Sequence, residues 1–154
     1  MEVTVARFKE VLGHFATGVT IIAAEGPVGF TCQTFNALSL EPLLITFAAR
    51  SAGSSWPQVR DRGIIVASIL GDDQESVARA VATSSPDKFA GVDLITCANG
   101  APGVAGALAH VEASIVNVST HGDHDVVIAE VTGLHAQHGD PLLYFRGGFG
   151  TFRS

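Results

Sequence analysis

Short apolar stretches, each ended by glycine or proline, recur along this 154-residue chain and constrain its fold more than any other feature. Runs of roughly four to eight residues rich in β-branched side chains are typical of strands. The clearest examples are residues 18–24, 28–35, 43–48 and 64–70. Because Gly and Pro interrupt the ladders that regular elements need, these breaks separate one strand from the next. The sequence therefore predicts a mainly β protein.

Three segments have helical spacing instead. Apolar side chains recur every three or four positions over residues 5–15, after a possible N-cap at Thr4. Residues 53–60 leave room for one or two helical turns, and residues 73–83 carry apolar side chains on one helical face. We expect the first helix to cover one face of the sheet.

The last third of the chain has the pattern of a long hairpin. Residues 107–119 and 125–136 flank a turn at 120–124, and residues 141–145 form a closing strand. Because the helices do not alternate regularly with the strands, a closed antiparallel barrel with helical decoration fits better than a doubly wound sheet. A chain of this length that is 47% apolar is expected to form one domain, residues 1–154.

Charge and cysteine content exclude several classes of protein. Nine Lys and Arg against 15 Asp and Glu give a net charge of −6, which argues against a protein that coats nucleic acid or anionic lipid. No apolar run reaches the roughly 18 residues of a membrane span, and the first residues do not resemble a signal peptide. Cys32 and Cys97 lie outside any CxxC spacing. We expect a soluble cytoplasmic protein with reduced thiols.

Familiar catalytic motifs are missing from the sequence. It has no P-loop, no GxGxxG after a strand and no GxSxG elbow. A zinc site needs three or four converging ligands, and four of the six histidines fall in expected turns or strand ends, so a metal site is disfavoured. Hydroxyl and amide side chains do gather where strands are expected to end, and such groups can bind a phosphate together with backbone N–H groups. They are Thr31, Gln33, Thr34, Asn36, Ser39, Ser51, Ser54 and Ser55.

Seven segments in this order resemble the flavin reductase family with the FMN-binding split barrel, the reductase components of two-component flavin-dependent monooxygenases. The segments are residues 15–22, 28–35, 38–42, 87–92, 106–109, 122–124 and 141–150. The resemblance implies a six-stranded antiparallel split β-barrel, a homodimer, and FMN or FAD bound near the subunit interface. It also implies NADH or NADPH as the electron donor and a separate flavin-dependent oxygenase that receives the reduced flavin.

The resemblance also implies where the flavin ring and ribityl chain are held. Thr31, Gln33 and Thr34 lie on the segment that matches the family's Thr-x-Asn-Ser-Phe, and Ser39 would support them. Gln33 and Thr34 replace the Asn-Ser that many members carry, so the contacts to the ring differ from the family pattern.

The phosphate is implied to lie at the serine-rich turn. Ser51, Ser54 and Ser55 would surround it, and Lys88 would supply a compensating positive charge.

Two further positions follow from the resemblance. His124, after Gly122 and Asp123, would lie beside the nicotinamide, where an imidazole can orient the carboxamide without acting as a base. Tyr144 would reach across the dimer to the flavin or nucleotide, or would pack against the barrel. A noncatalytic split-barrel protein that binds flavin or haem is the alternative, since fold does not fix function. His124 favours the reductase.

Overall fold

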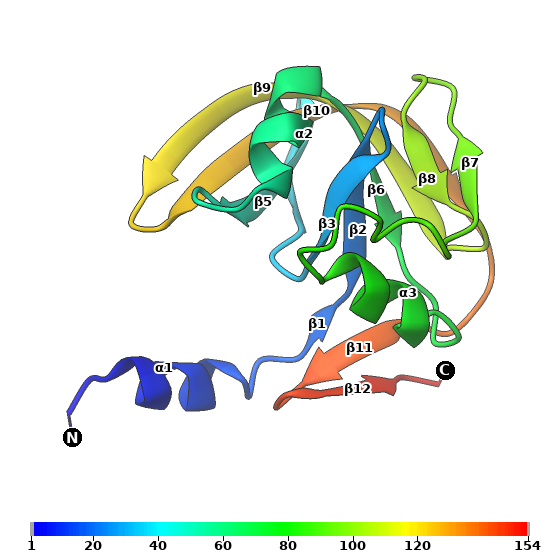
Figure 1. Ribbon diagram of the computed structural model, residues 1–154. Helices are drawn as coiled ribbons and strands as arrows, with labels where there is room; N and C mark the ends of the chain where they lie inside the picture. Colours follow the sequence, from blue (N-terminus) through cyan, green and yellow to red (C-terminus); the bar gives the residue numbers. More distant parts are fainter. Residues whose placement is uncertain (1, 154) are drawn as a thin grey trace.

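The computed structural model describes residues 2–153, and its largest element is one curved antiparallel sheet (Figure 1). The spatial order of its seven strands is β3-β2-β6-β9-β10-β5-β4. In chain order these strands are β2 (Thr20–Ala24), β3 (Val28–Cys32), β4 (Asn36–Leu40), β5 (Leu43–Arg50), β6 (Ile64–Ile69), β9 (Ala109–His121) and β10 (His124–Ala136). All pairs are antiparallel, as the sequence predicts.

Two smaller sheets accompany the main one. One contains β1 (Thr17–Gly18), β11 (Leu142–Phe145) and β12 (Gly148–Thr151), and the other pairs β7 (Leu94–Thr96) with β8 (Pro102–Val104). The predicted closing strand is therefore β11, but it pairs with β1 and β12 and lies outside the main ladder.

Three helices decorate the sheets: α1 (Val5–Leu12), α2 (Ser55–Arg62) and α3 (Glu75–Val81). Thr4 caps α1, because its hydroxyl accepts a hydrogen bond from the Arg7 N–H at 3.1 Å. α2 ends at Gly63, whose φ of 73° is the left-handed conformation that glycine adopts readily. The longest of the three has eight residues, so no helix over residues 2–153 approaches the length of about 20 that a bilayer requires.

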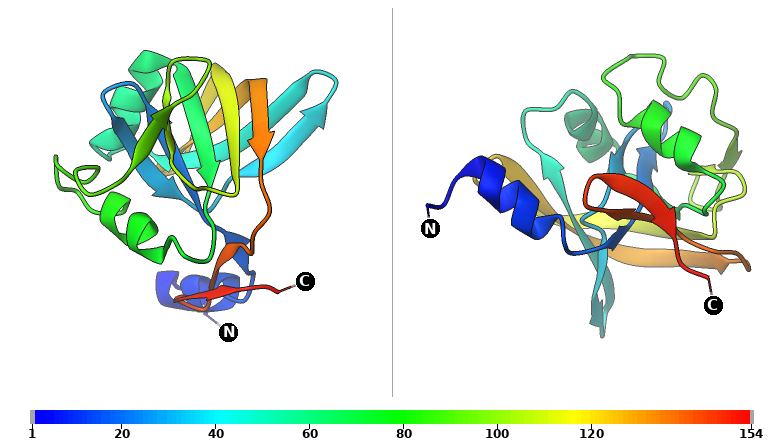
Figure 2. Two further views of the ribbon diagram at one scale, coloured as in Figure 1. Left: turned by 90° about the vertical axis from the view of Figure 1, so that its right-hand side faces the viewer. Right: turned by 90° about the horizontal axis from the view of Figure 1, so that it is seen from below.

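The expectation that the first helix covers a face of the sheet is wrong. α1 extends away from the sheet (Figures 1 and 2), and none of its residues is buried. Its apolar side chains are exposed, with Phe8 61% and Val5 73% accessible. The helical spacing correctly predicted a helix, but no other part of residues 2–153 buries its apolar face.

The mainly β architecture is confirmed, but the main sheet has seven strands where six were predicted, and its ladder does not close into a barrel within residues 2–153. Residues 28–35 do not form one strand, because β3 stops at Cys32 and the chain turns before β4. β3 and β4 are therefore the two edges of the ladder, and no strand pairing between them is found within residues 2–153. Register shifts in the β9–β10 pair, between Ile128 and Ala129 and between Val131 and Gly133, bend the sheet.

The concave side of the curved sheet holds the main core. Phe47 of β5 meets Trp56 of α2 edge-on and lies tilted against Phe30 of β3, with centroid distances of 6.1 Å in both pairs. Ring pairs at this spacing and tilt are favourable. The core therefore joins the sheet edge at β3 to β5, although the two strands are not ladder neighbours.

Candidate functional site

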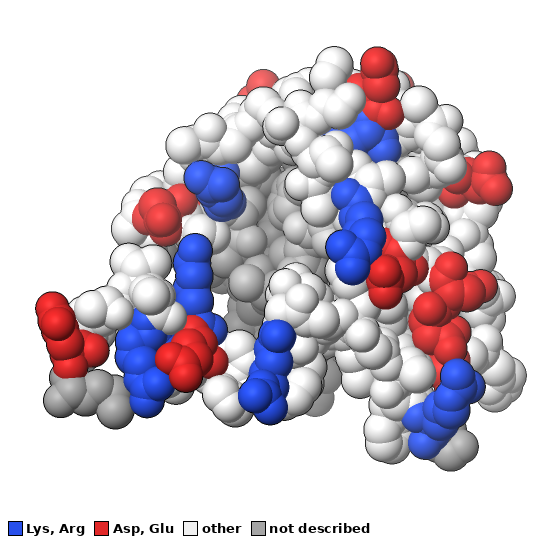
Figure 3. All heavy atoms as spheres, turned by 60° about the horizontal axis from the view of Figure 1, so that its bottom comes forward, with Lys and Arg blue, Asp and Glu red and all other residues white. Residues whose placement is uncertain are grey.

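A cavity of about 400 Å³ lies where β3, the end of β5, the start of α2 and the segment after α3 meet. Figure 3 shows a hollowed face of the molecule with several Lys and Arg side chains around it, although the whole chain is acidic. Apolar and thiol side chains of the lining include Phe30, Cys32, Trp56 and Val81. Its polar lining comprises Thr31, Gln33, Thr34, Arg50, Ser54, Ser55, Thr83, Ser84, Lys88 and His124.

The wall from β3 contains the three predicted ring-binding residues, but they are not equivalent. The Thr31 hydroxyl donates to the carbonyl oxygen of Ala78 in α3 at 2.8 Å. The Thr34 hydroxyl donates to the Ala48 carbonyl at 3.0 Å and accepts from the Ala48 N–H at 2.8 Å. Gln33 is exposed, and its amide makes no hydrogen bond to another residue of 2–153. Only Gln33 therefore keeps its full hydrogen-bonding capacity for a ligand.

Thr34 has a structural task that the sequence did not reveal. Its paired hydrogen bonds to Ala48 replace a backbone ladder between the end of β3 and β5. The Cys32 sulfur lies 3.3 Å from the same hydroxyl, and burial raises the pKa of the Cys32 thiol. The thiol therefore stays protonated and packs as part of the cavity wall.

The other side of the cavity has the chemistry of an anion site. The Lys88 ammonium donates to the Ser55 hydroxyl at 2.6 Å, and burial lowers the pKa of Lys88. Ser54 lies at the N-terminus of α2 without a side-chain cap contact, so its hydroxyl is available. A helix N-terminus, two hydroxyls and a cation together can hold a phosphate.

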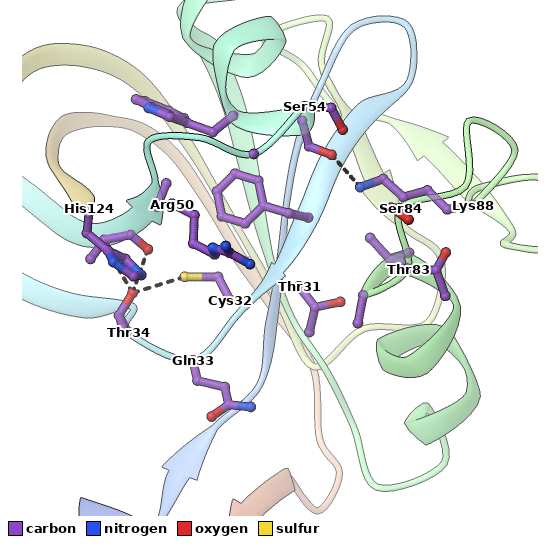
Figure 4. A pocket seen from close by; sticks show the side chains of 18 residues that line it. Thr31, Cys32, Gln33, Thr34, Arg50, Ser54, Thr83, Ser84, Lys88 and His124 are labelled. Carbon is purple, nitrogen blue, oxygen red and sulfur yellow. Dashed lines mark hydrogen bonds between the residues drawn. The ribbon is translucent and has the colours of Figure 1, made fainter. Parts of the chain in front are cut away.

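Sequence reasoning missed Thr83 and Ser84, which line the same side of the cavity (Figure 4). They precede Lys88 in a run of hydroxyl residues at 83–85, which repeats the composition of the serine turn at 51–55. That repeated composition was an available signal.

His124 lies on the opposite side of the cavity from Lys88, with Thr34 beside it (Figure 4). Its Nδ1 lies 2.7 Å from a carboxylate oxygen of Asp123, and this hydrogen bond lowers the pKa of Asp123. Because Nδ1 faces the carboxylate, Nε2 is free for another partner. The His124 side chain is 41% exposed, so a ligand in the cavity can reach it.

Arg50 is a third functional candidate that sequence reasoning missed. It ends β5 directly opposite His124 in the β5–β10 pair and lines the cavity between His124 and the serine turn. The sequence feature that could have identified Arg50 is a basic residue at an expected strand end, immediately before Ser51.

Three predicted residues lie outside the cavity lining. The Ser51 hydroxyl donates to Asp125 at 2.9 Å, so it holds the turn rather than facing the cavity. Ser39 is paired with Leu44 within the β4–β5 hairpin. Tyr144 packs edge-on against Phe149 in the small sheet, with ring centroids 5.2 Å apart. Within one chain, these three side chains do not join the other predicted residues.

Comparisons with known proteins agree with this architecture. A family model described as a flavin reductase like domain matches residues 12–153. The chain is 42% identical over 145 residues to HsaB of Rhodococcus jostii, the reductase subunit of a flavin-dependent monooxygenase, covering 92% of this chain and 74% of that protein.

Solved structures are also similar. Nitrilotriacetate monooxygenase component B from Mycobacterium thermoresistibile has a TM-score of 0.91 at 40% identity, covering 96% of this chain and 86% of the other. The NADH:FAD oxidoreductase SgcE6 of Streptomyces globisporus, in complex with NAD and FAD fragments, has a TM-score of 0.90 at 30% identity, with 96% and 92% covered. The chain therefore belongs to the flavin reductase like family.

Proposed function

We propose that this chain is the reductase component of a two-component monooxygenase. It takes hydride from NADH or NADPH, reduces FMN or FAD, and releases the reduced flavin to a separate flavin-dependent oxygenase. The observation that carries the proposal is one cavity lined both by the Lys88–Ser55 pair and by His124. HsaB is named a reductase subunit and SgcE6 an NADH:FAD oxidoreductase, which supports the proposal. In this proposal the whole chain, 1–154, acts as one flavin reductase domain.

The donor set of the cavity fits a flavin. Ser54, Ser55 and Lys88 offer hydroxyl and ammonium donors for a phosphate, and Gln33 offers an amide for the polar edge of the ring. Thr31 contributes the lone pairs of a hydroxyl whose proton is already donated to Ala78. When bound, the flavin supplies the redox chemistry, and the protein's share is to position and desolvate it.

His124 is the residue proposed to meet the nicotinamide. Asp123 fixes the imidazole through Nδ1, which leaves Nε2 to orient a carboxamide at the cavity mouth. Arg50, opposite it in the ladder, adds a positive charge on the same side, which suits the phosphates of a dinucleotide.

The proposal includes a homodimer and a split barrel. Phe8 of α1 and Leu40 of the β4–β5 hairpin are exposed, Leu40 to 81%. In the proposed homodimer a second copy of the chain buries these two apolar surfaces. Tyr144, outside the cavity of its own chain, would act across this interface. The Thr34–Ala48 hydrogen bonds link the residues after β3 to β5 where the ladder is open, which supports the proposed split barrel. A cytoplasmic location suits the two free thiols.

Flavin-dependent oxidation of NADH tests the proposal. Purified protein is mixed with NADH or NADPH, with and without FMN or FAD, and the absorbance of the reduced nicotinamide is followed. Oxidation only when both flavin and protein are present supports the reductase. Flavin uptake without turnover indicates the noncatalytic binder, and no flavin uptake rejects both.

Substitution of the exposed apolar residues tests the dimer. Phe8→Glu or Leu40→Glu places a charge on the proposed interface, and light scattering should then report the mass of one chain rather than two. A wild-type mass of one chain would contradict the dimer.

A further inference from the structure

Asp125 follows His124 in β10, yet it does not line the cavity. Its side chain is buried and collects three hydrogen bonds. Ser51 and Thr120 donate their hydroxyl protons to Oδ1 at 2.9 and 2.8 Å, and the Trp56 indole N–H donates to Oδ2 at 2.8 Å. Because charge-assisted hydrogen bonds to a carboxylate are strong, these donors are held firmly.

The three donors come from three different segments around the cavity. Ser51 begins the turn that leads to Ser54 and Ser55, Trp56 lies in the first turn of α2, and Thr120 lies on β9 across the hairpin from Asp125. A backbone bond from the Ser51 N–H to the Asp123 carbonyl, 3.1 Å long, strengthens the same junction. The serine turn at 51–55 and the β9–β10 turn that carries His124 are thus both hydrogen-bonded to the Asp125 carboxylate.

The carboxylate is chemically specific for this junction. Trp56 can only donate, so the atom facing it must accept. A carboxylate offers acceptors on both oxygens, whereas an amide offers only one. The nearest cation, Arg60, lies 3.8 Å away and is more than half exposed, so it contributes little to holding the three donors.

We propose that Asp125 is a positioning residue that fixes the flavin-phosphate turn and His124 relative to each other. The inference rests on the proposed function, since it assumes that the turn holds the flavin phosphate and that His124 meets the nicotinamide. Asp125 itself touches neither ligand. It acts through Ser51 and Trp56 on flavin binding, and through the β9–β10 tip on His124.

Asp125→Asn tests this with a side chain of nearly the same shape. Its amide oxygen can still accept from Trp56, but its NH₂ group can only donate. The hydroxyls of Ser51 and Thr120 must then rotate to accept, and the charge-assisted hydrogen bonds become weaker neutral ones. We expect amide hydrogen exchange in the ligand-free protein to speed up about tenfold, both at residues 51–55 and at 121–124. The emission of Trp56, the single tryptophan of the chain, should shift as its partner changes.

Kinetics then separate the two routes. We expect Asp125→Asn to raise the flavin Kd about tenfold and to lower kcat about tenfold, because small displacements of positioned groups slow turnover. In a His124→Ala background the effect on kcat should disappear, while the effect on the flavin Kd should remain. Additive losses in kcat would contradict the route through His124.

Two control variants keep the test specific. Thr46→Val removes another hydrogen bond between β5 and β10, from the Thr46 hydroxyl to the Val127 carbonyl at 3.0 Å, away from the cavity. Arg60→Ala removes only the exposed cation. Neither variant should change exchange at the two segments. Unchanged exchange in Asp125→Asn, or equal changes in Thr46→Val, would overturn the inference. Failure of the proposed function appears separately, as wild-type protein without flavin-dependent NADH oxidation.

Discussion

The β9–β10 ladder has a pair of facing histidines at each end, and the two pairs differ in almost every respect. At one end His110 faces His135, is 6% exposed, and contacts the Val104 carbonyl through Nε2 at 2.8 Å. At the other end His124 faces His121, lies at the cavity, and within residues 2–153 hydrogen-bonds through its side chain only to the neighbouring carboxylate of Asp123.

The difference shows what separates a structurally held histidine from a candidate ligand-binding histidine in this chain. The His110 and His135 rings stack with centroids 6.2 Å apart, and β8 supplies the carbonyl that holds His110. His110 therefore has its hydrogen bond and its ring contact within the chain. His124 has one nitrogen fixed and the other free beside a cavity, which is the arrangement expected of a residue that waits for a ligand. His110 and His124 are the same residue type and both lie near an end of the β9–β10 ladder. The difference between them comes from β8, which covers His110 and leaves His124 open to the cavity.

His110→Ala should give the largest effect, and only on stability. Removing a buried ring leaves a cavity and deletes a hydrogen bond to Val104, which should lower the free energy of unfolding by about 2–3 kcal/mol. Denaturant titration measures this loss, and kcat of the folded fraction should equal that of the wild type. A large drop in kcat would contradict the interpretation that His110 has a structural role and His124 a role at the cavity.

His124→Ala should have the opposite signature. Loss of one hydrogen bond of about 1.5–3 kcal/mol to the reacting ligand predicts a roughly 10- to 100-fold fall in kcat. The flavin Kd and the denaturation midpoint should stay close to wild type, because the side chain is 41% exposed. Steady-state kinetics beside a flavin titration check this, with His121→Ala as the matched control. Unchanged turnover would remove His124 from the site.

Lys88→Met should act on flavin affinity alone. Replacing the ammonium that contacts Ser55 should raise the flavin Kd about tenfold, as one charge-assisted contact is lost. Burial lowers the pKa of Lys88 in the free protein, so flavin affinity should begin to fall at a pH below the ordinary 10.5 as the ammonium loses its proton. Titrations across alkaline pH should show this slope in the wild type and not in Lys88→Met.

The smallest expected effect is the acid stability that Asp125 provides. Hydrogen bonds from Trp56, Thr120 and Ser51 lower the pKa of Asp125 below its ordinary 3.8. A lowered pKa in the folded state stabilises the protein above the ordinary value, and that gain is lost as the pH falls through the folded pKa. Unfolding measured below pH 4 should therefore bring wild type and Asp125→Asn closer together. A constant gap would mean that Asp125 does not titrate there.

Much of the fold was predictable because strand and helix signals are local. The alternating segments, the long hairpin and the Thr4 cap each depend on neighbouring residues, and the structure confirms them. The break between β3 and β4, and the exposure of α1, depend on what covers a segment in space. A run of β-branched and aromatic residues such as 28–35 carries no sign of that.

The candidate site was predictable in part for the same reason. Motif order identified Ser54, Ser55, Lys88 and His124, which the fold brings to one cavity. Arg50 was not predicted as a site residue because its place beside the cavity depends on its pairing with His124 in the β5–β10 ladder. Ser51 was placed at the phosphate, yet its hydroxyl is used by Asp125, a partner 74 residues away in the sequence that no local pattern reveals.

The exposed position of α1 has a consequence for assembly. Helices shorter than about 12 residues are marginal in water, because nucleating the first turn costs more than a few hydrogen bonds return. α1 has eight residues and no buried side chain, so the proposed homodimer predicts that the partner subunit helps to keep it helical. If the proposed dimer dissociates on dilution, α1 should lose its helix, and far-ultraviolet circular dichroism should vary with protein concentration.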